Sequence, residues 1–398
     1  MRLGLFISQF NQTEISKDPG LIARALADAG YEVTVYCRAS RSDEDNAKSR
    51  FPLAAQPFTI RPISRAEFNS GDFWRSEKNE TVIIYSWLSL RYSRLIRLLK
   101  TNGSKVILKL DSDGRLIYPA IPTYLRARAW KRSLISFFMY LVRLAQWYIF
   151  PRTVSWQRIK QIKMSDALII ESPRAAYNLQ KSLAFWKKET LAKKIWTIAN
   201  PVLNLNNLDI NFHPSRQDER KKSSTIISVG RWTDRRKNGR GLAEALMLLT
   251  KHSTWNIVLI GQGSSKLKDR IRRKNPNLEI SAIENVPHQE IWPYLNRSKI
   301  FLASSLSDSF NLAAAEALCC GCSLAGTPIE SFYFFTADNQ YGSIASDFSG
   351  PRLAEVLEKE IKKWEDNAYS SEDIAKHWQH RLSTAAIGGE IDRLIKSL

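Results

Sequence analysis

Acidic residues and cysteines are the scarce side chains of this 398-residue chain. It holds 39 Asp and Glu against 59 Lys and Arg, which gives a formal net charge of +20. An imbalance of that size predicts an anionic partner: nucleic acid, an acidic membrane surface or a phosphorylated substrate. The four cysteines are too few for a disulfide framework, and the run from Cys319 to Cys322 lacks the second ligand pair or the histidine of a zinc site. We expect all four to be small core residues.

Acidic residues are missing altogether between Asp113 and Asp166, where Lys and Arg are interleaved with aromatic residues. Within that segment, Ser133 to Phe150 is the most apolar stretch of the chain, but Arg143 interrupts it. We therefore expect a helix that lies in an anionic membrane surface through residues 124–163, rather than one that crosses the bilayer. An ordinary core helix with a basic outer face is the alternative.

A secretory leader is not evident either. The first ten residues, MRLGLFISQF, resemble a strand and become polar too soon for a signal peptide. Together with the cysteine content, this predicts a cytoplasmic protein that is peripheral on the inner face of the membrane.

The length exceeds what one core usually supports, so two domains are expected. Strands alternate with helices from Arg2 to Cys37, where Asp18-Pro19 predicts a capped helix start, and the same alternation resumes at Thr225. The pattern predicts two Rossmann-like, doubly wound α/β domains that face a cleft. The expected parts are an N-terminal domain over 1–205 with a basic aromatic insertion at about 120–163, a linker over 206–224, a second domain over 225–370, and a C-terminal helix over 371–398 packing back toward the first domain.

The first domain lacks two common ligand signals. No Gly-x-Gly-x-x-Gly follows its first strand, which argues against a dinucleotide site, and no histidine occurs in that half. Asp111 and Asp113 follow the strand over 105–110, and such a pair can bind a divalent metal. We instead favour positioning of an acceptor hydroxyl, or capping of the next segment, and we expect no metal.

The stretch from Phe301 to Cys320 combines a strand end, a Ser-rich turn with Asp308, and an Ala-rich helix whose single carboxylate is Glu316. Ligands of open α/β sheets bind where strands end, and the N–H groups of residues 310–312 at the helix start suit an anion. A surface aspartate and a solvated glutamate are the alternative.

Two other loops carry compatible chemistry. Arg231 and Lys237 share a loop after one strand and suit a diphosphate, and Gly261–Gly263 forms a tight turn that lets backbone approach a ligand. Two cations, a helix start and Glu316 together predict a nucleoside-diphosphate site, with the carboxylate on the ribose hydroxyls.

The order and spacing of these motifs resemble the donor-binding domain of family 4 retaining glycosyltransferases, which have the GT-B fold. The matching residues are Gly230-Arg231, Lys237, Gly261-Gln262-Gly263, Asp308-Ser309-Phe310-Asn311-Leu312, Glu316-Ala317 and Gly326-Thr327-Pro328. The resemblance implies that Arg231 and Lys237 neutralise the leaving diphosphate and that backbone near Phe310 to Leu312 binds the same group. It also implies that Asp308 touches the donor sugar and that the first domain binds the acceptor.

The chain departs from the family pattern at several positions. Asp308 replaces a glutamate, and Ser309 and Asn311 replace glycines. The acceptor-side histidine of many relatives is absent, which leaves Asp111 and Asp113 as the candidates to replace it. For the five histidines, His213, His252, His288, His377 and His380, we expect surface or interface roles.

The leading interpretation is a retaining hexosyltransferase that uses a nucleoside-diphosphate sugar and a glycan or lipid-linked acceptor. One alternative is a non-catalytic sugar-nucleotide-binding partner of another transferase. A basic nucleic-acid-binding protein is a weaker one, because no reading module is recognisable and such a protein has no need of Glu316.

Overall fold

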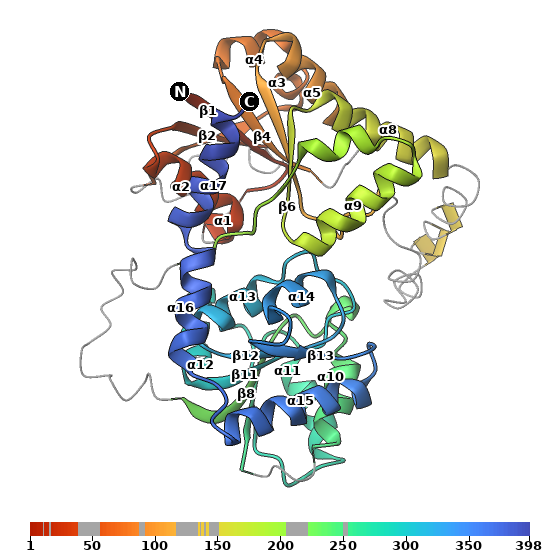
Figure 1. Cartoon of the computed structure of the whole chain (residues 1–398), viewed down its shortest axis with the longest axis vertical. Coiled ribbons are helices and arrows are strands. Elements are labelled where there is room, and N and C mark those ends of the chain that lie inside the picture. Colours follow the sequence, from red (N-terminus) through yellow and green to blue (C-terminus); the bar gives the residue numbers. More distant parts are fainter. Residues whose placement is uncertain are drawn as a thin grey trace. The chain divides into compact units, whose positions relative to one another are not determined.

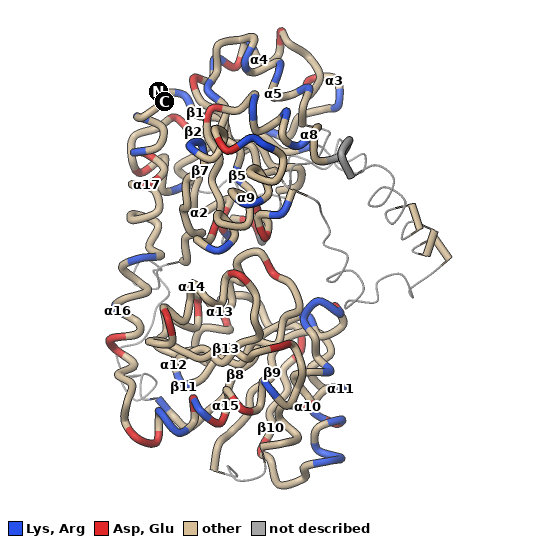
Figure 2. The backbone as a smooth tube through the Cα atoms, turned by 45° about the vertical axis from the view of Figure 1, so that its right-hand side comes forward, with Lys and Arg blue, Asp and Glu red and all other residues tan. Residues whose placement is uncertain are grey.

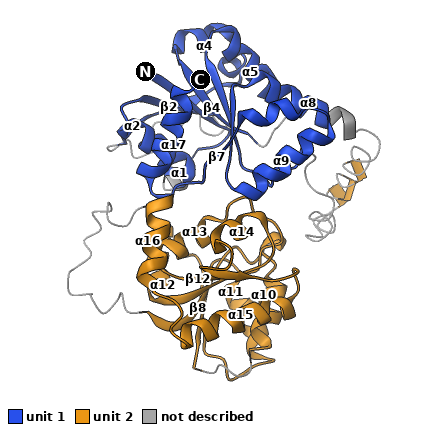
Figure 3. Cartoon of the chain, viewed as in Figure 1, with its two compact units in different colours: residues 1–118, 143–203, 382–398 blue, residues 119–142, 204–381 orange. Residues whose placement is uncertain are grey.

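The computed structural model describes residues 1–10, 12–15, 17–38, 56–86, 92–116, 134–135, 137–138, 141–142, 151–203, 222–249 and 254–398. The chain divides into two compact units (Figures 1 and 3). Unit 1 comprises residues 1–118, 143–203 and 382–398, and unit 2 comprises residues 119–142 and 204–381. Most of the expected linker and of the basic aromatic insertion lies outside the described residues.

Unit 1 is built on a seven-stranded, all-parallel sheet in the order β3-β2-β1-β4-β5-β6-β7. Its strands are β1 (Arg2–Ile7), β2 (Glu32–Arg38), β3 (Thr59–Ile63), β4 (Thr81–Ser86), β5 (Lys105–Leu110), β6 (Ala167–Ile170) and β7 (Ile195–Thr197). All six residues of β4 are buried, as expected for a central strand covered by helices on both faces. The chain order reverses between β1 and β4, which makes this the switch point of the sheet.

Helices join and cover these strands. They are α1 (Gln12–Ile15), α2 (Asp18–Asp28), α3 (Arg65–Phe68), α4 (Gly71–Glu77), α5 (Tyr92–Thr101), α8 (Pro151–Met164), α9 (Pro173–Phe185), the 3-10 helix η2 (Glu189–Lys194) and α17 (Thr384–Lys396). The sequence predicted the start of α2 but not the role of Asp18. Lys17 is the residue before the helix, so Asp18 lies inside the first turn and is not the cap.

Unit 2 repeats the architecture with six parallel strands in the order β10-β9-β8-β11-β12-β13. These are β8 (Ser223–Val229), β9 (Asn256–Ile260), β10 (Ile280–Ile283), β11 (Ser298–Ala303), β12 (Ser323–Gly326) and β13 (Gly342–Ile344). Its helices are η5 (Arg235–Lys237), α10 (Gly239–Met247), α11 (Ser264–Arg272), η6 (His288–Ile291), α12 (Trp292–Arg297), α13 (Leu312–Cys319), α14 (Glu330–Thr336), α15 (Gly350–Glu365) and α16 (Ser371–Leu382). Lys and Arg recur along α11 (Figure 2). The switch point of this sheet lies between β8 and β11.

The C-terminal segment forms two helices with different neighbours. In unit 2, the side chain of Gln379 on α16 donates to the carbonyl of Cys319 over 2.7 Å. In unit 1, α17 packs on α2, and the Tyr31 hydroxyl donates to Asp392 Oδ1 on α17 over 2.6 Å.

All four cysteines are buried and free. Among the described residues, no helix is both long and apolar enough to span a bilayer. The prediction of two doubly wound α/β domains is confirmed.

Candidate active site

Two loops of unit 2 meet where its central strands end. The loop after β8 leads into η5, and the loop after β11 leads into α13. The N–H of Leu306 donates to the carbonyl of Arg236 over 2.7 Å, and the Ser304 hydroxyl donates to the carbonyl of Lys237 over 2.7 Å. Because β8 and β11 are neighbours at the switch point, their carboxyl ends present both loops at one edge of the sheet.

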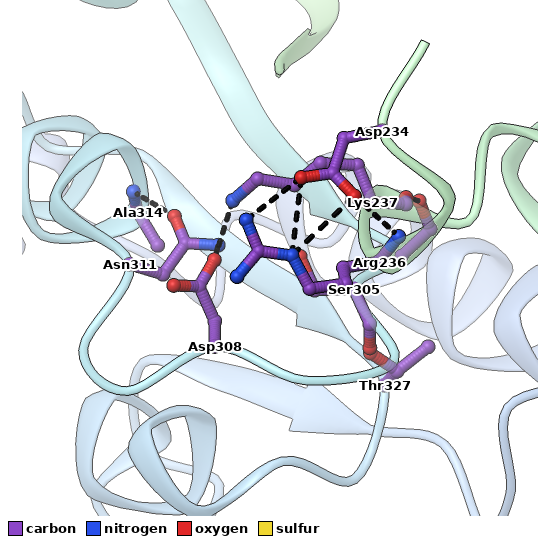
Figure 4. A network of polar contacts seen from close by, with 9 residues as sticks. Asp234, Arg236, Lys237, Ser305, Asp308, Asn311, Ala314 and Thr327 are labelled. Atoms are coloured by element: carbon purple, nitrogen blue, oxygen red, sulfur yellow. Dashed lines mark hydrogen bonds and ion pairs between the residues drawn. The ribbon is translucent and has the colours of Figure 1, made fainter. Parts of the chain in front are cut away.

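An ion pair joins these two loops. Lys237 Nζ donates to Asp308 Oδ2, and the side-chain amide of Asn311 donates to the same oxygen over 3.1 Å (Figure 4). Beside it, Arg236 forms a fork on Asp234, with Nη2 2.8 Å from Oδ2. The Lys237 and Asp308 side chains are 26% and 21% exposed. The Lys237 ammonium is thus paired with a carboxylate, and a ligand from solvent can reach both groups.

The start of α13 is shaped by Asn311. Its φ is +64°, a left-handed conformation that Asn adopts more readily than most residues, so Asn can stand where the resemblance expects glycine. Asn311 is the N-cap of α13, and its Oδ1 accepts from the N–H of Ala314 over 3.1 Å. Phe310 is buried and its ring centroid lies 5.0 Å from that of Phe335, which anchors the turn.

The third loop, Gly261–Gly263, lies against the first. Gly261 has a φ of +111°, and a Cβ there would lie 2.2 Å from the carbonyl oxygen of Gly230. The N–H of Trp232 donates to the carbonyl of Gln262 over 2.9 Å. Only glycine fits at 261, and the tight turn expected from the sequence is present. Arg231, on the loop between β8 and η5, is exposed.

A cavity of about 570 Å³ adjoins this corner. Its lining includes four basic side chains, and Lys237 and Asp308 are not part of it. The lining residues are Trp232, Thr233, Arg235, Asn238, Gly239, Arg240, Gly263, Lys266, Leu267, Arg270 and Leu306.

Glu316 lies on α13 and is buried, with a partner that the sequence analysis missed. Its Oε1 is 2.6 Å from Nε2 of His288, the first residue of η6. We expected a surface or interface role for His288, whereas the structure places its ring against the candidate ribose-binding carboxylate. The only available signal was its position five residues after β10, in another loop at the carboxyl edge of the sheet.

In unit 1, Asp111 and Asp113 have different surroundings. Asp113 Oδ1 accepts from the N–H of Arg115 over 3.1 Å, and the Asn178 side chain donates to its carbonyl over 3.0 Å. This is the geometry of a residue that caps its own turn. Burial raises the pKa of Asp113, and the Arg115 N–H and guanidinium oppose that rise.

Asp111 adjoins a buried cluster that the sequence did not predict. Lys109 Nζ lies 3.1 Å from Glu171 Oε1, 2.5 Å from Asn200 Oδ1 and 3.7 Å from Asp18 Oδ2. Asn200 Nδ2 donates to the same Glu171 oxygen over 2.8 Å. These groups come from the carboxyl ends of β5 and β6, from the segment that follows β7 and from the start of α2.

Burial dominates the electrostatics of this cluster. It raises the pKa of Asp18 to about 6, although the Lys109 ammonium opposes that rise. It also raises the pKa of Glu171 well above its ordinary value, again against Lys109. The pKa of Lys109 is raised in turn, since the carboxylates of Glu171, Asp18 and Asp111 outweigh its own desolvation. Among the described residues, no group of three or more His, Cys, Asp or Glu is arranged to hold a metal ion.

Comparison with known proteins supports the same fold. Residues 209–379 match the family model of glycosyl transferases group 1. A glycosyltransferase from Rickettsia africae superposes with a TM-score of 0.68 at 13% identity, covering 100% of this chain and 98% of that chain. HepE (Alr3699) of Anabaena, in complex with UDP and glucose, gives 0.63 at 13% identity and covers 100% of both chains. WaaG, a glycosyltransferase involved in lipopolysaccharide biosynthesis, gives 0.61 at 13% identity over 99% of both chains.

No curated protein sequence matches the chain. The matched segment runs from before β8 into α16 and contains the described site of unit 2. The chain has the GT-B fold, and its second unit carries a segment like that of the group 1 glycosyl transferases.

Proposed function

We propose that this protein is a retaining hexosyltransferase of glycosyltransferase family 4. It takes a nucleoside-diphosphate sugar and transfers the hexose to a glycan or lipid-linked acceptor at the cytosolic membrane surface. The observation that carries the proposal is the contact of Lys237 with Asp308 at the switch point of a GT-B domain, beside the start of α13. HepE, which shares the fold, binds UDP and glucose.

The donor diphosphate would lie between Lys237 and the N–H groups of residues 310–312, with Arg231 contributing from the same loop as Lys237. Asp308 now neutralises Lys237, so diphosphate binding exchanges one anion for another at this lysine and frees the carboxylate to face the sugar. Glu316 would bind the ribose hydroxyls, and backbone at Gly261–Gly263 can approach the nucleotide closely.

In the proposed reaction the nucleoside diphosphate leaves the sugar, and fixed hydrogen-bond donors of the site stabilise the negative charge that develops on it. Lys237, Arg231 and the helix start supply positive potential where charge develops, and the leaving phosphate oxygen accepts the proton of the acceptor hydroxyl. No strong general base is needed, and Asp111 or Asp113 would orient the acceptor. We propose that no metal takes part.

Attachment to an anionic membrane through residues 124–163 completes the proposal. Leu134, Ile135 and Phe138 are largely exposed within that segment, and long basic side chains flank it in the sequence. Exposed apolar side chains with a basic surround suit a surface-bound segment.

Release of hexose from labelled UDP, GDP and ADP sugars, with and without acceptor lipid extracts, tests the proposal. We expect one donor to raise the melting temperature and to be turned over, and Lys237→Met to lose both effects. Lys268→Met, a half-buried lysine on α11 that does not line the cavity of unit 2, is the matched control. Addition of EDTA should not lower the rate. Donor binding without turnover under every acceptor condition would favour the non-catalytic partner, and salt-sensitive binding of duplex DNA without donor binding would favour the nucleic-acid reading.

A further inference from the structure

A second cavity, in unit 1, is distinct from everything described so far. It has a volume of about 1150 Å³ and lies between α8, the end of α9 and η2. We call it the lysine-rimmed cavity; its lining residues are Trp156, Ile159, Lys160, Lys163, Met164, Trp186, Lys188, Thr190 and Leu191.

The chemistry of this lining is divided between an apolar part and a basic rim. Ile159 is buried, and Met164, Trp186 and Leu191 pack against the core of unit 1 while still lining the cavity. Trp156 is 61% exposed at the mouth, which is unusual for so large an apolar side chain. An amphiphile could therefore bury an acyl segment here without displacing polar protein groups.

The rim of the cavity is positively charged. Lys160, Lys163 and Lys188 are exposed, and Lys160 Nζ lies 5.5 Å from the ring centroid of Trp156. Within the described ranges, no Asp or Glu lines the cavity and none of these three ammonium groups forms an ion pair. Lys194 differs from these three lysines, because its ammonium donates hydrogen bonds to carbonyls at the end of α8.

We propose that the lysine-rimmed cavity binds the phosphate end of an anionic membrane phospholipid. The three lysines surround the phosphate, and the first part of the acyl chain lies against Trp156 and the apolar floor. A tryptophan with a polar edge and an apolar face suits the depth of the headgroups. A nucleotide would use the aromatic rings and the lysines but would leave the aliphatic floor unmatched.

The sequence order supports this occupant. The exposed residues Leu134, Ile135 and Phe138 precede α8 in the chain, and no acidic residue lies between Asp113 and Asp166. The cavity thus belongs to the segment with the greatest excess of basic residues, which an anionic membrane attracts. The inference rests on the membrane part of the proposed function and is independent of donor binding in unit 2.

The test uses the full chain with phosphatidylcholine vesicles that contain or lack phosphatidylglycerol, whose acyl chains are brominated near the headgroup. We expect sedimentation with the anionic vesicles only, and quenching of tryptophan fluorescence by bromine. Lys160→Glu/Lys163→Glu should weaken binding about tenfold or more, since each basic residue near such a surface contributes measurably. Lys181→Glu, on α9 but outside the lining, is the control, because it makes the same charge reversal at a single position away from the cavity.

Trp156→Phe/Trp186→Phe should keep binding but quench less than the wild type, because Trp130 and Trp147 of the membrane segment remain to be quenched; this readout does not respond to charge alone. Wild-type binding by the double glutamate variant would overturn the proposal, as would full quenching in the variant lacking both tryptophans. So would displacement of the vesicles by UDP or by inorganic phosphate, because either would identify a different ligand. The rise in melting temperature caused by the sugar-nucleotide donor is measured in parallel for the wild type and for Lys160→Glu/Lys163→Glu. If the donor stabilises neither protein, the transferase proposal fails while the lipid site remains supported by the vesicle data.

Discussion

Ionisation of the Asp18 carboxyl group lowers the stability of the folded protein, because the group is largely buried. Its side chain is 17% exposed, and Oδ2 is 3.7 Å from Lys109 Nζ. Burial raises its pKa from 3.8 to about 6; Lys109 opposes this rise and Asp111 adds to it. Between about pH 4 and pH 6 the folded chain thus holds a proton that the unfolded chain has released.

The sign of the effect on stability follows directly. Where the folded state binds more protons, the free energy of unfolding falls as the pH rises, and it stops falling once both states have lost the proton. The full difference in pKa corresponds to about 3 kcal/mol. Asparagine resembles the protonated aspartate, so Asp18→Asn should match the wild type near pH 4 and exceed it by up to about 3 kcal/mol at about pH 8.

Hydrogen exchange of amides in β1 and α2, followed by mass spectrometry from pH 4.5 to 8 (about the window in which the proton is lost), reports the local free energy of unit 1. Asp72→Asn, on the exposed face of α4 and paired with Arg75 over 2.9 Å, is the matched control and should change stability by less than about 1 kcal/mol. A difference between Asp18→Asn and wild type that is the same at every pH would refute the reasoning. Lower stability of the variant at pH 8 would refute it as well.

Three other perturbations have definite expected outcomes. Lys237→Met should weaken UDP binding in calorimetry by about tenfold or more, the value of a charge-assisted hydrogen bond; unchanged affinity would remove this lysine from the site. His288→Gln, which keeps a donor for Glu316, should retain more UDP affinity than His288→Ala, and equal losses would show that the contact with Glu316 is irrelevant. Gly114→Ala should lower the melting temperature without altering UDP binding, because φ is +81° and the new Cβ would lie 1.8 Å from the Ala175 carbonyl oxygen. An unshifted melting temperature would contradict that geometry.

The sequence predicted the central strands well because their signal is local. The run at 105–110, for example, is apolar enough to be recognised without knowledge of its partners. The edge strands β3, β7 and β13 were missed, since each is only three to five residues long and β3 contains Pro62. β12, with the sequence SLAG, has no β-branched residue, so its conformation comes from pairing with β11 and β13.

The site shows the same division between local and distant information. Gly261 and the start of α13 carry local signals, since a positive φ and a helix start restrict residue type. The contact of His288 with Glu316 spans 28 positions, and that of Lys109 with Asn200 spans 91. No periodicity links such residues, because the fold alone brings the loops after parallel strands to one edge.

The charge clusters around Lys109 in unit 1 and around Lys237 in unit 2 differ in exposure, and this difference bears on where we expect the donor diphosphate to bind. Lys109 is 1% exposed, and its ammonium lies 3.1 Å from the equally buried Glu171, so removing the Glu171 carboxylate would leave a buried charge without its nearest carboxylate. Lys237 and Asp308 are 26% and 21% exposed, so solvent and a ligand can reach both side chains. We therefore expect a diphosphate to replace Asp308 on Lys237, whereas the buried Lys109 is shielded from an anion in solvent. The difference in exposure thus predicts anion exchange at Lys237 in unit 2 and none at Lys109 in unit 1.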